Sequence, residues 1–173
     1  MNNYDSPIAQ DTLDWVLSFV IHYNLCPFAK GPVNKGQLKI QVCDKTKKAQ
    51  ALEELMMEIH YLDQHPEIET TLFVFSQLNK DFFTYLDFVD LADHLLTQHD
   101  YDGIYQFVSF HPDYYFADSE PDDPANLTNR SPYPMIHILR EEQLEKVIAV
   151  YGDTSEIPKK NIELLRSLNF KGR

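Results

Sequence analysis

Glycine is scarce in this sequence, with 5 residues among 173. The chain has no glycine-rich phosphate loop, no GxGxxG or GxSxG motif, and no CxxC pair. Such motifs let backbone amides approach a phosphate closely or expose a nucleophile. Their absence disfavours ATP-dependent and dinucleotide-dependent chemistry, so we expect no nucleotide cofactor.

Positive charge and long apolar runs are also lacking. The chain has 15 Lys and Arg against 27 Asp and Glu, a net charge of -12. This charge repels phosphate backbones and anionic lipids, so we expect neither nucleic acid nor a membrane as partner. The start of the chain lacks the basic and apolar regions of a signal peptide. Without an export signal, we expect the two cysteines, Cys26 and Cys43, to be reduced thiols, and we predict a cytoplasmic protein.

The remaining composition is typical of a folded protein, with 43% hydrophobic and 24% charged residues. The length predicts a single domain spanning residues 1–173. Strand patterns are found at residues 37–42, 70–76, 104–110 and 135–140. Helical spacing of apolar residues is found at 13–21, 46–62, 81–96, 141–151 and 157–170. We expect N-caps at Asp11 or Thr12, at Thr46 and at Asp81.

The order of these segments predicts the fold. Helices separate the first three strands, which favours crossover connections and parallel neighbours. The fourth strand follows the third without a helix, so we expect it to pair antiparallel. The fold class is therefore α/β, a mixed sheet of about four strands with helices packed on it. A ferredoxin-like α+β arrangement is the competitor.

The long segment 111–134, between the third and fourth strands, shows no regular pattern. Its second half, DDPANLTNRSPYP, contains three prolines and two asparagines. Loops beyond about 12–15 residues are uncommon in compact domains and are usually functional or disordered. Aromatic anchors such as Tyr114 and Tyr133 disfavour disorder, so we predict an ordered, Pro-rich loop that carries the site.

Two histidines and an aspartate form the candidate catalytic group. An antiparallel pairing of the last two strands would bring His111 and Asp113 towards His137, with His111 as general acid and base and Asp113 orienting it. The same three residues could instead hold a divalent metal. The structural alternative is that HPD, residues 111–113, forms a turn.

Two arginines suggest that the ligand is a small anion. The guanidinium groups of Arg130 and Arg140 match carboxylate or phosphate oxygens. The structural alternative is that Arg130 pairs with a nearby carboxylate and holds the loop shut. The other candidate substrate-binding residues are Asn126, Asn129, Ser131 and Tyr133.

Cys26 is a further candidate, as a nucleophile. His22 and Lys30 lie near it in sequence, and a cationic neighbour lowers a thiol pKa. However, the end of a helix raises that pKa, and a buried, inert thiol is the default reading.

Four segments carry a family resemblance: NLCPFAK at 24–30, ETTLFVF at 69–75, YQFVSFHPDYYFAD at 105–118 and DDPANLTNRSPYPMIHILRE at 122–141. Together they resemble an uncharacterised bacterial family, domain of unknown function 1415, over nearly the whole chain. The resemblance implies a single-domain bacterial protein and supplies no reaction, cofactor or catalytic residue.

These patterns lead to two functional hypotheses. The first is a hydrolase or lyase that acts on a small anionic substrate at loop 111–134. The second is a non-catalytic protein whose loop binds a small anionic ligand or a protein partner. The sequence predicts no oligomeric state.

Overall fold

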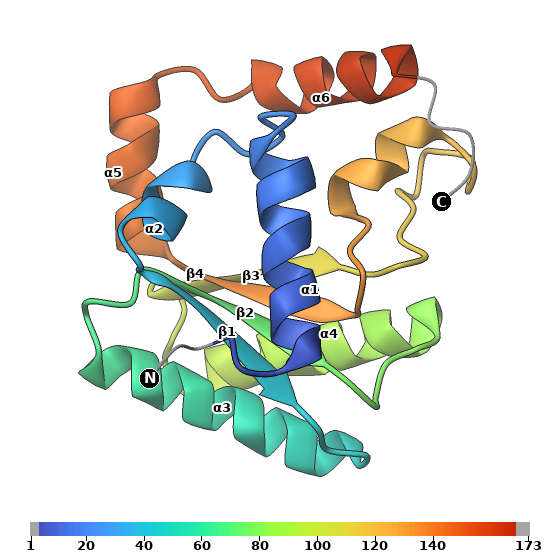
Figure 1. Ribbon diagram of the computed structural model, residues 1–173. Coiled ribbons are helices and arrows are strands. Elements are labelled where there is room, and N and C mark those ends of the chain that lie inside the picture. Colours follow the sequence, from blue (N-terminus) through green and yellow to red (C-terminus); the bar gives the residue numbers. More distant parts are fainter. Residues whose placement is uncertain (1–3, 169–173) are drawn as a thin grey trace.

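The computed structural model describes residues 4–168. A four-stranded mixed sheet with the order β1-β2-β4-β3 forms its centre, and helices cover both faces (Figure 1). The predicted α/β class is confirmed. The strands are β1 (Leu38–Cys43), β2 (Thr70–Phe75), β3 (Tyr105–Phe110) and β4 (Met135–Arg140).

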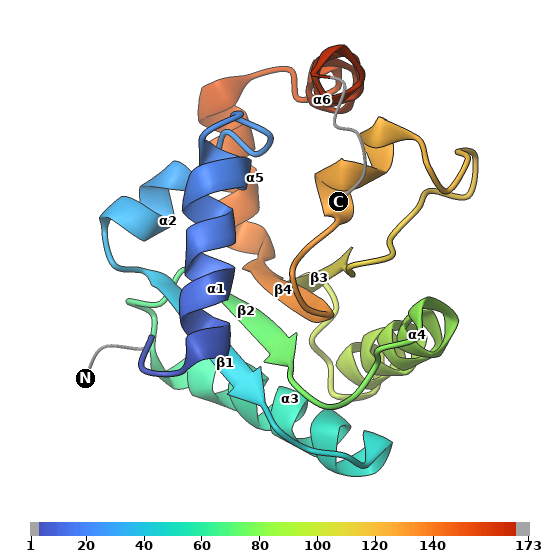
Figure 2. The same cartoon turned by 45° about the vertical axis from the view of Figure 1, so that its right-hand side comes forward.

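The helices form a layer on each side of the sheet (Figure 2). One face, which we call the α1 face, is covered by α1 (Pro7–Trp15), the π-helical turns η1 (Val16–Ile21), α2 (Lys30–Asn34) and α5 (Glu141–Tyr151). The opposite α3/α4 face is covered by α3 (Lys48–Gln64) and α4 (Phe82–Gln98). A short 3-10 helix, η2 (Pro124–Asn129), lies in the loop before β4, and α6 (Glu156–Ser167) packs beside it. None of the helices within residues 4–168 is long and apolar enough to cross a membrane.

The strand order corrects one expectation about the sheet. β1 and β2 are parallel neighbours, joined by the crossover through α3, as predicted. β3 was expected beside them, but β4 lies between β2 and β3 and pairs antiparallel with both. β4 takes this central place because Ile136 and Ile138 are fully buried, whereas β3 is only partly buried. The predicted antiparallel pairing of β3 with β4 is confirmed.

The two faces of the sheet build separate hydrophobic clusters. Phe73 and Phe75 on β2 pack with Ile136 and Ile138 on β4 against α3 and α4. The alternating residues of the same strands, among them Leu72, pack against α1. Full burial of such a side chain stabilises the fold by about 1.5–3 kcal/mol. This alternation determines on which face of the sheet each side chain of β4 lies, including that of His137.

The first helix begins earlier than predicted. Ser6 is the N-cap, and its hydroxyl accepts a hydrogen bond from Ala9 N (3.1 Å), with Pro7 in the first turn. The expected cap Thr12 lies inside the helix and donates to Ile8 O (2.7 Å). A serine followed by proline is a favoured start because the proline has no amide hydrogen that needs a partner. The helix then widens into η1, a rare geometry that is frequent near functional sites.

Three other helix starts follow, two of which had a predicted cap. Asp81 caps α4 as predicted, accepting from Thr84 N (2.8 Å). η2 was not predicted; Asp123 caps it by accepting from Ala125 N (2.9 Å), and Pro124 occupies the first position. At α3 the N-cap is Lys47, without a side-chain hydrogen bond, and not Thr46.

Candidate functional site

His111 is a buried residue with both ring nitrogens bonded. Its side chain is fully buried against the rings of Phe82 and Tyr85, at centroid distances of 5.3 and 5.1 Å. Nε2–H donates to Asn79 O (2.9 Å), and Nδ1 accepts from Asp113 N (3.0 Å). Burial lowers the pKa of His111, so the ring is neutral and makes the turn-forming contacts of the structural alternative.

The two histidines do not converge on one hollow. The contacts of His111 with Phe82 and Tyr85 place it against α4, whereas His137 shares the α1 face of β4 with Met135. Asp113 contacts His111 through its backbone amide, and its side chain is exposed. No group of three or more His, Cys, Asp or Glu side chains within residues 4–168 could hold a metal ion. The expected trio of His111, Asp113 and His137 is therefore not assembled, because His111 packs against α4, Asp113 is exposed and His137 lies on the α1 face of β4.

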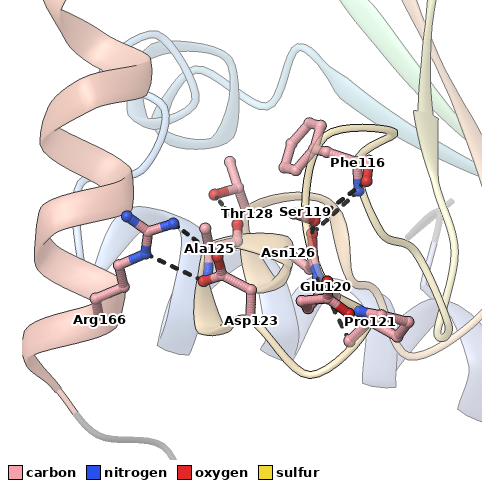
Figure 3. Close-up of polar contacts among 9 residues, drawn as sticks. All are labelled: Phe116, Ser119, Glu120, Pro121, Asp123, Ala125, Asn126, Thr128 and Arg166. Carbon is pink, nitrogen blue, oxygen red and sulfur yellow. Dashed lines mark hydrogen bonds and ion pairs between the residues drawn. The ribbon is translucent and has the colours of Figure 1, made fainter.

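The loop 111–134 is ordered by its own polar side chains, as Figure 3 shows for the region around Asn126. Asn126 is fully buried. Its Oδ1 accepts from Phe116 N (3.0 Å) and Ser119 Oγ (2.5 Å), and its Nδ2 donates to Glu120 O (2.8 Å). The amide thus has its main hydrogen bonds within the loop, and the ordered loop that the sequence predicted is confirmed.

The neighbouring candidates bond to protein groups as well. Asn129 Nδ2 donates to Ser109 O (2.9 Å), and Ser131 Oγ donates to Tyr133 O (2.6 Å). The Tyr133 hydroxyl donates to Asp11 Oδ2 (2.7 Å) in α1. These contacts tie the loop to β3 and to α1.

Arg130 bonds to the loop backbone. Its Nε donates to Tyr114 O (2.8 Å), and its Nη2 donates to Pro121 O. Arg130 therefore holds the loop shut, as the structural alternative proposed, but through carbonyl groups. The carboxylate of Asp123 pairs instead with Arg166 of α6 (2.6 Å), which lowers the pKa of Asp123 to about 2 (Figure 3).

Arg140 ties the end of β4 to the end of α3. Nη2 donates to Leu62 O (2.5 Å) and His65 O (3.1 Å), Nε donates to Ile68 O (3.0 Å), and Nη1 donates to the Tyr105 hydroxyl (3.1 Å). A cation beside the last carbonyls of a helix is stabilising. Every nitrogen of this guanidinium therefore already has a protein partner.

A cavity of about 250 Å³ lies on the α1 face of the sheet, and of the site candidates described above only His137 and Arg140 line it. All four strands contribute to its floor. His137 of β4 is paired with Leu72 of β2 on one side and with Val108 of β3 on the other, and Leu38 of β1 also lines the cavity. Phe110 extends the floor, 6.3 Å from the His137 ring between centroids. We call this space the α1–α5 cavity.

The walls of the α1–α5 cavity come from the helices that stand over the sheet in Figure 2. They are mainly apolar: Trp15, Val16 and Val20 from α1 and η1, Phe28, Ala29, Pro32 and Val33 in and before α2, and Leu144 and Val147 from α5. The polar residues Glu69 and Arg140 lie together at one end, and Gln143 of α5 also lines the cavity. The pairing of Thr70 with Leu139 explains this, since Glu69 and Arg140 are the next residues at that end of the two strands.

His137 is the only histidine among the residues lining the cavity. Its Nε2 lies 2.7 Å from Thr70 Oγ1, and Thr70 Oγ1 lies 2.6 Å from Ile138 O. Burial lowers the pKa of His137 to about 4, so the ring is neutral at neutral pH. A neutral imidazole in an apolar wall can accept or donate one hydrogen bond to a bound molecule.

Cys26 also lines this cavity, in the turn that joins η1 to α2. Burial raises the pKa of its thiol, and backbone hydrogen bonds from Phe28 and Ala29 oppose that shift only in part. A thiol in this state is a poor nucleophile at neutral pH.

Three of the residues predicted from the sequence thus meet at the cavity: His137, Arg140 and Cys26. The others, His111, Asp113, Asn126, Asn129, Arg130, Ser131 and Tyr133, lie outside its lining. Sequence reasoning missed Thr70 and Trp15. The available signal was the histidine on the otherwise apolar face that Met135 and Leu139 share with it.

Comparison with known proteins places the chain in a family. A family model described as "Protein of unknown function (DUF1415)" matches residues 7–173. Neither the curated proteins nor the solved structures yield a match. Because the family match covers nearly the whole chain, the protein belongs to the DUF1415 family.

Proposed function

We propose that the protein binds a small, mainly apolar molecule in the α1–α5 cavity without transforming it. The observation that carries this proposal is the cavity itself, about 250 Å³ with an almost wholly apolar lining around His137 and Thr70. An apolar protein cavity of about 150 Å³ already binds benzene. Pockets with apolar walls and a few placed polar groups are typical ligand sites.

A hydrolase or lyase at loop 111–134 ranks second. Such an enzyme needs a histidine that exchanges protons with a substrate and an arginine that holds an anion. His111 is fully buried with both nitrogens bonded, and Arg130 donates to two backbone carbonyls. The arginines suggested an anionic ligand, but the guanidinium groups of Arg130 and Arg140 already donate to protein oxygens. These contacts disfavour such a ligand.

The chain has one tryptophan, and Trp15 lines the cavity, which gives a direct test. Toluene, phenol and 1-hexanol should be titrated into the protein while Trp15 fluorescence and calorimetric heat are recorded. We expect at least one to bind with a Kd below about 1 mM, equivalent to about -4 kcal/mol, and to shift the Trp15 emission.

A matched pair of substitutions on α5 controls this experiment. Val147→Phe places a ring in the cavity and should weaken binding at least about tenfold, since the volume is then occupied. Val150→Phe makes the same change at a residue of the same helix that is 91% exposed, and binding should be unaffected. Equal affinities for both variants, or no binding to the unaltered protein, would contradict the proposal.

A further inference from the structure

The hydrogen bonds of Thr70 fix the position of a proton on the cavity floor. A threonine hydroxyl has one proton to donate and can accept with its lone pairs. Thr70 Oγ1 lies 2.6 Å from Ile138 O, and a carbonyl oxygen can only accept. The hydroxyl proton must therefore point to Ile138 O, which leaves Thr70 Oγ1 an acceptor for any other partner.

His137 must supply the proton for its contact with Thr70. The distance from His137 Nε2 to Thr70 Oγ1 is 2.7 Å, a short hydrogen bond. Since Thr70 Oγ1 accepts here, Nε2 has to be the protonated nitrogen of the neutral ring. Nδ1 then has a free lone pair and can only accept.

Nδ1 of His137 has no donor from the protein in the described part of the chain, residues 4–168. Its register neighbours Leu72 and Val108 are apolar. Arg140 also lines the cavity, but its nitrogens donate to backbone carbonyls and to Tyr105. Because burial lowers the pKa of His137 to about 4, the lone pair stays unprotonated at neutral pH.

We infer that the α1–α5 cavity selects apolar molecules that carry one neutral hydrogen-bond donor, such as a hydroxyl group, which donates to His137 Nδ1. A hydroxyl that enters an apolar site without a partner loses its hydrogen bonds to water, which is costly. His137 Nδ1 replaces one of them. A carboxylate has no proton to offer and would face the lone pair. This inference rests on the proposed function and specifies its ligand class.

Thr70 acts as a positioning residue in this scheme. Without its hydroxyl oxygen, neither ring nitrogen of His137 would have a fixed partner, and the proton could occupy Nδ1. Thr70→Val keeps a similar shape and removes the hydroxyl. It should reduce the preference for a donor ligand without blocking the cavity.

The test compares phenol, toluene and benzoate, which share a ring and differ in one polar group. Their affinities are measured for the unaltered protein and for His137→Leu, which keeps an apolar side chain at this position. In the unaltered protein, phenol should bind at least as tightly as toluene and at least about tenfold more tightly than benzoate. In His137→Leu, the ratio of phenol to toluene affinity should fall at least about tenfold.

The outcomes separate this inference from the proposed function. If toluene and phenol bind and their affinity ratio is the same in His137→Leu, the inference is overturned while the cavity remains a binding site. If no probe binds to the unaltered protein, both are overturned. Loss of the phenol preference with retained toluene binding supports the inference.

The tautomer can be read without any ligand, which keeps the inference testable if His137→Leu does not fold. Nitrogen-15 NMR of the imidazole distinguishes a protonated from an unprotonated ring nitrogen. We expect His137 to be protonated at Nε2 and bare at Nδ1, and to lose this uniform state in Thr70→Val. A proton on Nδ1 in the unaltered protein would overturn the inference.

Discussion

His111 and His137 look alike in the sequence, since each belongs to or follows an apolar strand. The structure separates them by the bonding of their rings. His111 has two protein partners, the Asn79 carbonyl and the Asp113 amide. Within residues 4–168, the ring of His137 has one hydrogen-bonding partner, Thr70, and we propose its other nitrogen as the acceptor for a ligand. Residue type and spacing in the sequence do not show how many ring nitrogens of a histidine are bonded to the protein.

Replacement of His111 by alanine should destabilise the fold. The change removes a fully buried ring and leaves Asn79 O and Asp113 N without their partner. We expect the free energy of unfolding in urea to fall by about 2–4 kcal/mol. Asp113→Ala is the control and should change it by less than about 0.5 kcal/mol, because the contact uses the backbone amide. A His111→Ala protein as stable as the control would return His111 to the catalytic candidates.

Because of His137, the free energy of unfolding should decrease as the pH falls below 6.5. Its pKa is about 4 in the folded protein, below the ordinary 6.5 of an unfolded chain. Between these two pH values His137 is protonated in the unfolded chain but neutral in the folded protein. The contribution of His137 to the free energy of unfolding is therefore fully present above pH 6.5 and is lost as the pH falls towards 4. From about pH 7.5 to 4.5, the unaltered protein should lose about 2 kcal/mol more than His137→Leu.

Urea unfolding at the two pH values measures this difference. Carboxyl groups also titrate in this interval, but they are common to both proteins, so the comparison isolates His137. His94→Leu, on the exposed surface of α4, controls for the loss of an imidazole. The same loss in His137→Leu as in the unaltered protein would show that burial does not restrain protonation of His137.

Among the elements, η2 and its flanks show how a short polar helix can order a long loop. Asn126 bonds to the chain on both sides of Pro121 and is fully buried. From outside, α6 holds the same helix through Arg166 and Asp123 (Figure 3). The loop is thus restrained from within and from the following helix.

Asn126 and Asn129 provide a matched test of this account. Asn126→Ala removes several buried hydrogen bonds and should lower the free energy of unfolding by about 2 kcal/mol, with faster amide exchange throughout 111–134. Asn129→Ala removes one bond, to Ser109 O, and should have about half that effect or less. Equal effects would mean that the buried amide does not organise the loop.

The elements also show what sequence patterns can predict. Strand positions followed from alternating or continuous apolar residues, and Asp81 followed from its place before an apolar stripe. The starts at Ser6 and Asp123 were missed, although each precedes a proline in the favoured first position. The periodicity of apolar residues gives little weight to such signals, because Pro7–Trp15 and Pro124–Asn129 are short.

At the level of the whole molecule, the cavity is a property of segments that lie far apart in the chain. Trp15, Leu72, Val108, His137 and Val147 each belong to a different element. Their types are ordinary for a protein core, so no single segment signals a hollow. Only the placement of β4 between β2 and β3 puts His137 in the middle of the floor. This is why the sequence predicted the fold class and three residues that line the cavity, His137, Arg140 and Cys26, but not the location of the cavity.

The central position of β4 also determines the order in which the strands can pair during synthesis of the chain. Within residues 4–168, β3 pairs with β4 alone, and β2 pairs with β1 and, once it has been made, with β4. The nascent chain therefore exposes the unpaired edges of β2 and β3 until residues 135–140 have left the exit tunnel. Because β4 is the last of the four strands to be made, closure of this sheet is the final pairing event among them.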